Sequence, residues 1–445
     1  MALDRLNLAT LKSQLRPHLT RRNVLAASGL AAAAGLLSAR PADHGGAHNG
    51  YFKRLSEALR EAGLARPTLI VDKALLHQNI DTLMSRLAPG TGSGMNYRIV
   101  AKSLPALGLI KEVSARARTK RLMVFHQPFL NLIAQTMPAA DLLLGKPMPV
   151  AAAARFYRHL KPGPFDPARQ VQWLIDSPGR LAQYRDLANA QDLTLNINIE
   201  LDVGLHRGGL TTLSDLDDML TIIEAAPRLT FTGFMGYDPQ LAGVPTLLGW
   251  QQRALETSRA IYQQFNDRAA ARLGQAARQN WTLNTAGSPT YALHTDTRVA
   301  NEVAVGSALV KPSHFDVPTL SSHVPAAFIA TPVIKSIEKT QLPVLEVLSG
   351  PRRWWDTNQT RAFFIYGGKW MAEPVSPPGL QLNGFFGRST NQEMLNGSAK
   401  VDLKPDDYVF LRPDQSEFVF LQFGDIAVYD QGKIVDQWPV FTQGA

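Results

Sequence analysis

Short β-rich runs alternate with helical stretches from about residue 67 to residue 284, and this alternation restricts the fold more than any other feature. The helical stretches carry apolar residues three or four positions apart, as helices packed on a sheet require. Eight strands alternating with helices predict an α/β fold, a (β/α)8 TIM-type barrel. The rival, a doubly wound open sheet, is disfavoured because no Gly-x-Gly-x-x-Gly pattern follows the first strand. The expected strands are Thr68–Val71, Tyr97–Ala101, Arg121–Phe125, Asp141–Leu144, Val171–Ile175, Leu193–Leu201, Leu229–Gly236 and Trp281–Asn284.

The pattern changes after about residue 315, where short β-type runs are separated by Gly, Pro and Asn/Asp turns without a long helical pattern. We therefore expect a signal and linker over residues 1–45, the barrel over 46–315 and a C-terminal all-β domain over 316–445. The expected strands of this domain are Val344–Leu348, Ala362–Tyr366, Tyr408–Leu411, Phe418–Phe423 and Asp425–Tyr429. Its core is expected to contain the aromatic residues Trp354, Trp355, Phe363, Phe364 and Trp370.

The N-terminal segment resembles a twin-arginine export signal: Arg21-Arg22 precede the weakly apolar run Ala26–Leu37. That run is too short to span a bilayer. We expect export by the twin-arginine machinery to the periplasm, with membrane tethering as the alternative if the signal is retained. Residues 1–40 carry +5 of the net charge of +9, and no basic run follows them, which disfavours nucleic-acid binding. The chain has no cysteine, so disulfides, thiolate metal sites and a cysteine nucleophile are excluded.

Reactive residues follow the expected strands, and in a barrel of this type the strand ends build the active site. Lys102 ends the second strand and Tyr237 follows the seventh. Arg207 follows the sixth strand, and the small-residue turn Ala286-Gly287-Ser288 follows the eighth, with Gly306-Ser307 further on. A lysine amine can form a Schiff base, and a Gly/Ser turn leaves backbone N–H groups free for a phosphate. Arg207 and Tyr237 could contact the ring of a cofactor. A Schiff-base lysine, a phosphate-binding turn and residues that contact a ring together indicate pyridoxal 5′-phosphate (PLP).

The chain resembles the D-threonine aldolase/D-serine dehydratase family of PLP enzymes, which share the alanine-racemase barrel followed by a β domain (fold type III). The resemblance rests on Pro67–Asp72, Arg98–Lys102, Glu200–Gly209, Gly233–Tyr237, Gly287–Thr290, Glu302–Gly306 and Val435–Pro439. It implies that Lys102 forms the Schiff base and acts as an acid/base, and that Arg207 and Tyr237 contact the cofactor ring. It also implies that Ala286, Gly287 and Ser288, with Gly306, hold the phosphate. The family further implies a homodimer.

The sequence departs from this family where a divalent metal would bind. Family members that cleave or dehydrate β-hydroxy amino acids resemble Pro-x-His-x-Cys or Pro-x-His-x-Asp near the C-terminus. Here the stretch is Pro413-Asp414-Gln415-Ser416-Glu417, so Gln415 and Glu417 occupy the ligand positions. Glutamine is a poor substitute for imidazole at a transition metal, although Gln and Glu together could hold a hard cation. The resemblance therefore does not imply that this chain binds a divalent metal.

The function expected from these residues is a PLP-dependent lyase acting on a D-amino acid, a β-hydroxy amino acid in the first instance, by retro-aldol cleavage or β-elimination. A metal-independent amino-acid racemase is the runner-up, and it needs a second base opposite Lys102. A PLP- or amino-acid-binding homologue without catalysis also fits the missing metal pair. The remaining rival is a barrel hydrolase using Asp202 and Glu302. His126 and His206 lie near expected strand ends, but a lone histidine is more often a structural polar residue than a catalytic one.

Overall fold

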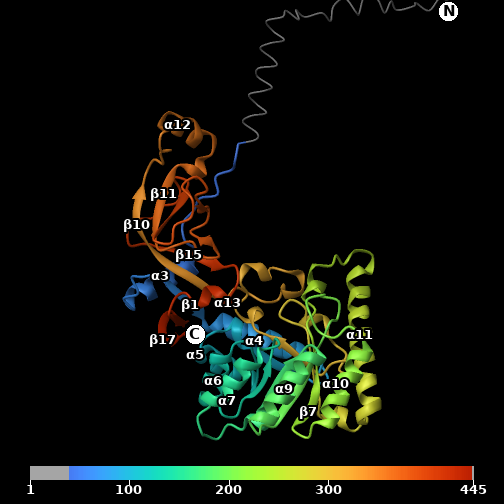
Figure 1. Ribbon diagram of the computed structural model, residues 1–445. Helices are drawn as coiled ribbons and strands as arrows, with labels where there is room; N and C mark the ends of the chain where they lie inside the picture. The colour runs from blue at the N-terminus through green and yellow to red at the C-terminus, as the bar shows by residue number, and fades with distance from the viewer. Residues whose placement is uncertain (1–39, 443–445) are drawn as a thin grey trace, which may run out of the picture.

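The computed structural model describes residues 40–442 as a parallel barrel joined to a second, mostly antiparallel sheet (Figure 1). The barrel is closed because its first and last strands, β2 and β9, pair in parallel, with Asn96 opposite Glu302. The (β/α)8 barrel and the additional β domain expected from the sequence are confirmed. The barrel strands are β2 (Asn96–Val100), β3 (Arg121–Val124), β4 (Asp141–Leu144), β5 (Val171–Ile175), β6 (Leu195–Leu201), β7 (Leu229–Gly236), β8 (Thr282–Thr285) and β9 (Glu302–Val305).

One expected barrel strand is wrong. The run Thr68–Val71 forms β1 (Thr68–Asp72), which lies in the second sheet between β10 and β16. The eighth barrel position is taken by β9, whose four residues are all buried. Both segments are short and fully buried, so their hydrophobic pattern does not distinguish one sheet from the other. Lys102 therefore follows the first strand of the barrel, not the second.

Helices surround the barrel, and several begin at a side chain that caps their first backbone N–H groups. Asp72 accepts from the Leu75 N–H at 3.0 Å at the start of α4, and Thr212 accepts from the Asp215 N–H at 3.1 Å at the start of α10. The longer helices each bury apolar residues against the strands, whereas the four residues of α8 are not buried. The helices are α4 (Lys73–Leu87), α5 (Leu107–Ala117), α6 (Gln127–Thr136), α7 (Val150–His159), α8 (Pro167–Gln170), α9 (Pro178–Ala190), α10 (Leu213–Ala225) and α11 (Trp250–Leu273).

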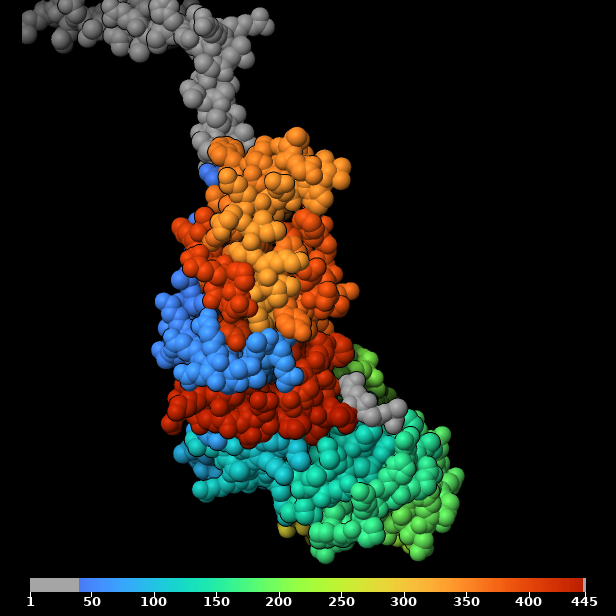
Figure 2. Space-filling model, turned by 90° about the vertical axis from the view of Figure 1, so that its left-hand side faces the viewer, coloured from blue at the N-terminus to red at the C-terminus, as the bar shows by residue number. Residues whose placement is uncertain are grey.

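The second sheet has nine strands and draws on both ends of the described chain. Figure 2 shows the blue segment around α3 (Gly50–Glu61) between orange and red C-terminal segments above it and a red C-terminal segment below it. The residues of α3 pack with β1, β10, β15 and β16 in a core separate from that of the barrel. Besides β1, the strands are β10 (Ala327–Ile337), β11 (Arg361–Tyr366), β12 (Ala372–Ser376), β13 (Gln381–Leu382), β14 (Gln392–Gly397), β15 (Tyr408–Pro413), β16 (Asp425–Asp430) and β17 (Lys433–Pro439).

Two runs expected as strands of this domain are helical. Val344–Leu348 leads into α12 (Glu346–Trp355), and Phe418–Phe423 begins in α13 (Glu417–Phe420). In α13, Val419 and Phe420 are buried and Phe418 is exposed, an arrangement that one helical turn provides. The aromatic set divides as well: Phe363 and Trp370 are buried, whereas Trp354 on α12 is 59% exposed.

The barrel interior contains a buried ion-pair network. Arg98 on β2 is fully buried, and its Nε lies 2.5 Å from Glu302 Oε1 while Nη2 lies 3.1 Å from Oε2. Its Nη1 donates to Asp141 and to the carbonyl oxygen of Leu122. Asn284 on β8 donates to the same Glu302 oxygen at 2.8 Å. These bonds fix Glu302 as a structural carboxylate.

Within residues 40–442, no helix is long and apolar enough to cross a membrane. The expected twin-arginine segment, Arg21-Arg22 with Ala26–Leu37, lies outside the described residues.

Candidate active site

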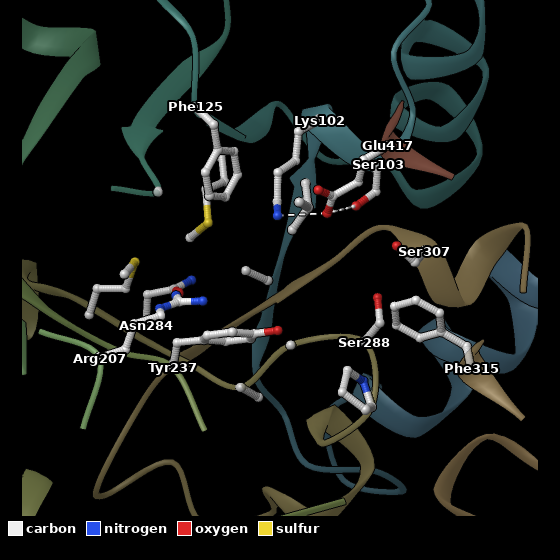
Figure 3. A pocket seen from close by; sticks show the side chains of 18 residues that line it. Lys102, Ser103, Phe125, Arg207, Tyr237, Asn284, Ser288, Ser307, Phe315 and Glu417 are labelled. Atoms are coloured by element: carbon white, nitrogen blue, oxygen red, sulfur yellow. Dashed lines mark hydrogen bonds and ion pairs between the residues drawn. The ribbon is translucent and has the colours of Figure 1, made fainter. Parts of the chain in front are cut away.

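Lys102 reaches the barrel mouth because the strand β2 turns into a single 3₁₀ turn, η1 (Ala101–Ser103), at its carboxyl end. Its ammonium group lies 2.6 Å from Glu417 Oε1 and 4.7 Å from the centre of the Phe125 ring. The side chain is 37% exposed, and Figure 3 shows it directed into a cavity. The lysine is therefore accessible to a ligand from the barrel mouth.

Tyr237 and Arg207 form the opposite side of this cavity. The Arg207 guanidinium lies 5.1 Å from the centre of the Tyr237 ring, a cation–π contact (Figure 3). Burial raises the pKa of the Tyr237 hydroxyl, an effect that the charge of Arg207 opposes and that of Glu417 reinforces. Gly287 supports the ring from behind, because a Cβ there would lie 2.4 Å from Tyr237 Cε2. The ring position thus depends on a glycine at 287.

The turn after β8 presents polar groups toward the same space. Ala286 has φ 62°, an unusual conformation for a residue with a side chain, and it turns the chain sharply after the strand. Ser288 Oγ accepts from the N–H groups of Gly306, at 3.2 Å, and Ala308, at 3.1 Å. A Cβ on Gly306 would lie 2.8 Å from the Val100 carbonyl oxygen, so only glycine allows this close approach. Because this hydroxyl oxygen accepts both hydrogen bonds, its own hydrogen can donate to a phosphate.

Three buried residues hold this turn from behind, and the sequence analysis did not identify them as a group. Thr290 Oγ1 accepts from the Gly287 N–H at 3.1 Å and donates to Asp238 Oδ1 at 2.7 Å. His294 Nε2 donates to Asp238 Oδ2, also at 2.7 Å. Asp238 and Thr290 are fully buried, and His294 is 5% exposed. Because Asp238 follows Tyr237 directly, this network also connects the turn to the tyrosine.

The cavity that these groups line has an empty volume of about 630 Å³, part of it open to solvent. Six of the seven expected site residues line it: Lys102, Arg207, Tyr237, Ala286, Gly287 and Ser288. The seventh, Gly306, contributes its N–H from just outside the lining. Sequence reasoning missed several contributors. Most of them carry no reactive group, and Ser103, the neighbour of Lys102, was passed over as part of the break after the strand. The missed residues are Ser103, Met123, Phe125, Met235, Asn284 and Phe315.

Other candidates lie elsewhere. Gln415 Nε2 contacts Met371 Sδ at 3.2 Å and does not line the cavity, whereas Glu417 does. The His206 side chain is 84% exposed and pairs with Asp202, so this carboxylate belongs to the loop and not to a pair with Glu302. The His126 ring makes an edge-to-face contact with the Phe129 ring outside the cavity lining. Among residues 40–442, no group of three or more His, Asp or Glu side chains is placed to hold a metal ion.

Comparison with known proteins places this geometry in a family. Residues 71–314 match the family model for the N-terminal domain of alanine racemase. An alanine racemase of Levilactobacillus brevis is 26% identical over 184 residues, a match that spans 38% of this chain and 44% of that protein.

Solved structures resemble most of the described fold, including both the barrel and the β domain. A D-threonine aldolase from Filomicrobium marinum has a TM-score of 0.61 at 15% identity, over 84% of this chain and 94% of that one. A D-threo-3-hydroxyaspartate dehydratase from Delftia sp. HT23 has a TM-score of 0.64 at 16% identity, over 84% and 97%. An alanine racemase from Bacillus anthracis has a TM-score of 0.62 at 14% identity, also over 84% and 97%. With more than half of its length matched by the family model, this chain belongs to the family of proteins that carry the alanine racemase N-terminal domain, a family that binds PLP.

Proposed function

We propose that this chain binds PLP at Lys102 and uses it to act on an amino acid. The observation that carries the proposal is the convergence of the Lys102 amine, Arg207 with Tyr237, and the Ser288 turn on one cavity. These groups fit the cofactor: an accessible amine, a cationic and aromatic pair for the ring, and for the phosphate a serine hydroxyl held by two backbone N–H groups. When bound, PLP withdraws electrons from the Cα of an amino acid, so that a bond to Cα can break.

Each side chain of the cavity would have its own role in binding the cofactor or in moving a proton. Lys102 would hold the cofactor and then move a proton at Cα. Arg207 would orient the ring, and the Ser288 hydroxyl, oriented by the Gly306 and Ala308 N–H groups, would hold the phosphate. Phe125, packed against the Lys102 ammonium, shields the lysine from part of the solvent.

The reaction that the geometry favours is a lyase step on a D-amino acid with a β-hydroxyl group. Lys102 and Glu417 form one ion pair at one side of the cavity, so both proton carriers act from the same side. Racemisation needs proton carriers on both faces of Cα, and burial keeps the Tyr237 hydroxyl protonated, which makes it a donor and a weak base. Racemisation nevertheless stays the second candidate, because the matched Levilactobacillus brevis protein is an alanine racemase.

Titration of the purified protein with PLP, followed by visible absorption, tests cofactor binding. Wild-type protein should develop a band that Lys102→Ala lacks and that Lys111→Ala, a surface lysine on α5, retains. Borohydride reduction and peptide mapping should then place the cofactor on Lys102. A wild-type protein without the band refutes the proposal. Chiral chromatography of the products from D- and L-threonine and D- and L-alanine distinguishes cleavage from racemisation.

We also propose export through residues 1–45 to the periplasm and assembly as a homodimer. Exposed apolar residues support an assembly: Leu247 and Leu248 near the barrel mouth are 67% and 71% exposed, and Phe385 in the β domain is 54% exposed. Replacing Arg21 and Arg22 with lysine should retain the protein in the cytoplasmic fraction of a host with twin-arginine machinery. Sedimentation equilibrium should give twice the chain mass, and a monomer mass would contradict the dimer.

A further inference from the structure

Glu417 enters the barrel cavity from the β domain. It begins the short helix α13, and its Oε1 lies 2.6 Å from Lys102 Nζ and 3.4 Å from the Ser103 hydroxyl, which donates to it (Figure 3). The charge of Glu417 also reaches the Tyr237 hydroxyl, whose pKa it raises. Glu417 is the only carboxylate among the described residues that line this cavity. It therefore faces Lys102, which moves a proton in the proposed reaction, and Tyr237 on the opposite side of the cavity.

The segment that carries Glu417 is held firmly in place. Ser416 is fully buried, and its Oγ lies 3.2 Å from Ser307 Oγ at the end of the β9 turn. Asp414 accepts from the Ser313 hydroxyl at 2.8 Å, and its carbonyl oxygen accepts from the His314 N–H at 3.1 Å. Hydrogen bonds across the boundary between the barrel and the β domain thus set the position of Glu417, as a preorganised catalytic group requires.

We propose that Glu417 is the acid/base group for the β-hydroxyl of the substrate, and that its contact with Lys102 returns the proton at the end of each turnover. The inference rests on the proposed PLP-dependent function and names a second catalytic residue for it. It also names the substrate feature that this residue recognises, an ionisable hydroxyl at Cβ.

The retro-aldol step balances with these two groups alone. The Glu417 carboxylate takes the proton of the β-hydroxyl group. The electron pair of that O–H bond then forms the C=O bond of the departing aldehyde. The Cα–Cβ bond breaks, and its electron pair stays on Cα. The Lys102 ammonium supplies the proton that Cα gains. Glu417 is then protonated and Lys102 is neutral, and a proton passes across their 2.6 Å contact to restore the ion pair. Threonine would give glycine and acetaldehyde without a net proton exchanged with water.

The test compares Glu417→Gln, which keeps the shape and removes the acid/base group, with Gln415→Ala. Gln415 lies two residues away and contacts Met371 outside the cavity, so its loss should leave activity unchanged. Two substrates separate the roles: D-threonine has a β-hydroxyl, whereas D-alanine reports only proton exchange at Cα. All assays use full-length protein loaded with PLP and are repeated with EDTA.

Glu417→Gln should lower kcat for D-threonine cleavage by roughly 10²- to 10⁴-fold, the usual contribution of a general acid/base. The PLP absorption band, the KM and deuterium exchange at Cα of D-alanine should change by less than about tenfold. Glu417→Asp, a shorter carboxylate, should recover part of the cleavage rate. In the protein without PLP, Lys102 should react several-fold faster with an amine-modifying reagent in Glu417→Gln, because the variant releases the amine from its ion pair.

Each contrary result has a distinct meaning. Cleavage by Glu417→Gln within a few-fold of wild type overturns the inference, as does an equal loss of cleavage and of Cα exchange. A wild-type protein that shows the band and exchanges Cα but does not cleave D-threonine or D-phenylserine overturns the inference and leaves PLP binding in place. A wild-type protein without the band overturns both.

Discussion

Gly287→Ala is the change that most directly tests how the Tyr237 ring is placed. The added Cβ would lie 2.4 Å from Tyr237 Cε2, whereas carbon atoms in contact are normally about 3.5–4.0 Å apart. The ring must therefore move by roughly 1 Å or more. The backbone at 287 needs no positive φ, so the side-chain clash is the whole perturbation.

The cost depends on whether the cavity is filled. Overpacking a well-packed site costs about 1–3 kcal/mol. Without PLP the ring can shift into the empty part of the cavity, so the free energy of unfolding should fall by only about 1 kcal/mol. With PLP bound, the displaced ring competes with the cofactor, and a penalty of about 1–3 kcal/mol weakens binding by about 5- to 140-fold.

PLP titrations of four proteins measure this: wild type, Gly287→Ala, Tyr237→Leu and the double variant. Gly287→Ala should weaken binding in the wild-type background and change it by less than about twofold once the ring is removed. Gly243→Ala is the matched control, because a Cβ there meets nothing within 4 Å. Equal weakening in both backgrounds, or none in either, would refute the placement of Tyr237 against Gly287.

Three further predictions concern ionisable side chains that are buried or partly buried. Arg98→Met should lower the free energy of unfolding in urea by about 3–5 kcal/mol because Glu302 stays buried without its main partner, and a loss below about 1 kcal/mol would contradict this. Burial lowers the pKa of His323 from 6.5 to about 4, so between these pH values the unfolded chain binds a proton that the folded chain does not. The free energy of unfolding should therefore fall as the pH drops from 6.5 toward 4, and His323→Gln should make it less dependent on pH in that range. Burial and the charge of Asp176 raise the pKa of Glu200 from 4.5 to about 7, so between these pH values the folded chain holds a proton that the unfolded chain has lost. Stability should decline as the pH rises through that interval, and Glu200→Gln should remove the decline in pH-dependent thermal unfolding.

The barrel could be predicted from the sequence, and its exact strand set could not. Alternation of strands and helices depends on local patterns, which the chain carries clearly between residues 96 and 285. The choice between β1 and β9 depends on which sheet each short buried run joins, and that is decided by contacts with residues more than 200 positions away. Glu417–Phe420 adopts a helix for a similar reason, since its apolar residues fit one turn packed on the barrel as well as a strand.

The reactive part of the site could be predicted because strand ends of a barrel converge on one face. Lys102, Arg207 and Tyr237 each lie within six residues after the end of a strand, so recognising the strand ends was enough to bring them together. The supporting groups follow no such rule. His294 lies 56 residues from Asp238, and nothing local to either residue indicates their bond.

The misassigned strand β1 is also a second connection between the β domain, which carries Glu417, and the barrel, which carries Lys102. β1 pairs with β10 and β16 of the β domain and continues without a break into α4 on the barrel. Asp72, at that junction, caps α4 and accepts a hydrogen bond from Tyr51 of α3 at 2.9 Å. The chain therefore crosses between the two sheets at β1 as well as at β10, which restricts how the β domain can turn over the barrel mouth. Two crossings limit domain motion more than one linker would, so β1 adds to the direct bonds of Ser416 and Asp414 in keeping the barrel lysine 2.6 Å from the β-domain carboxylate.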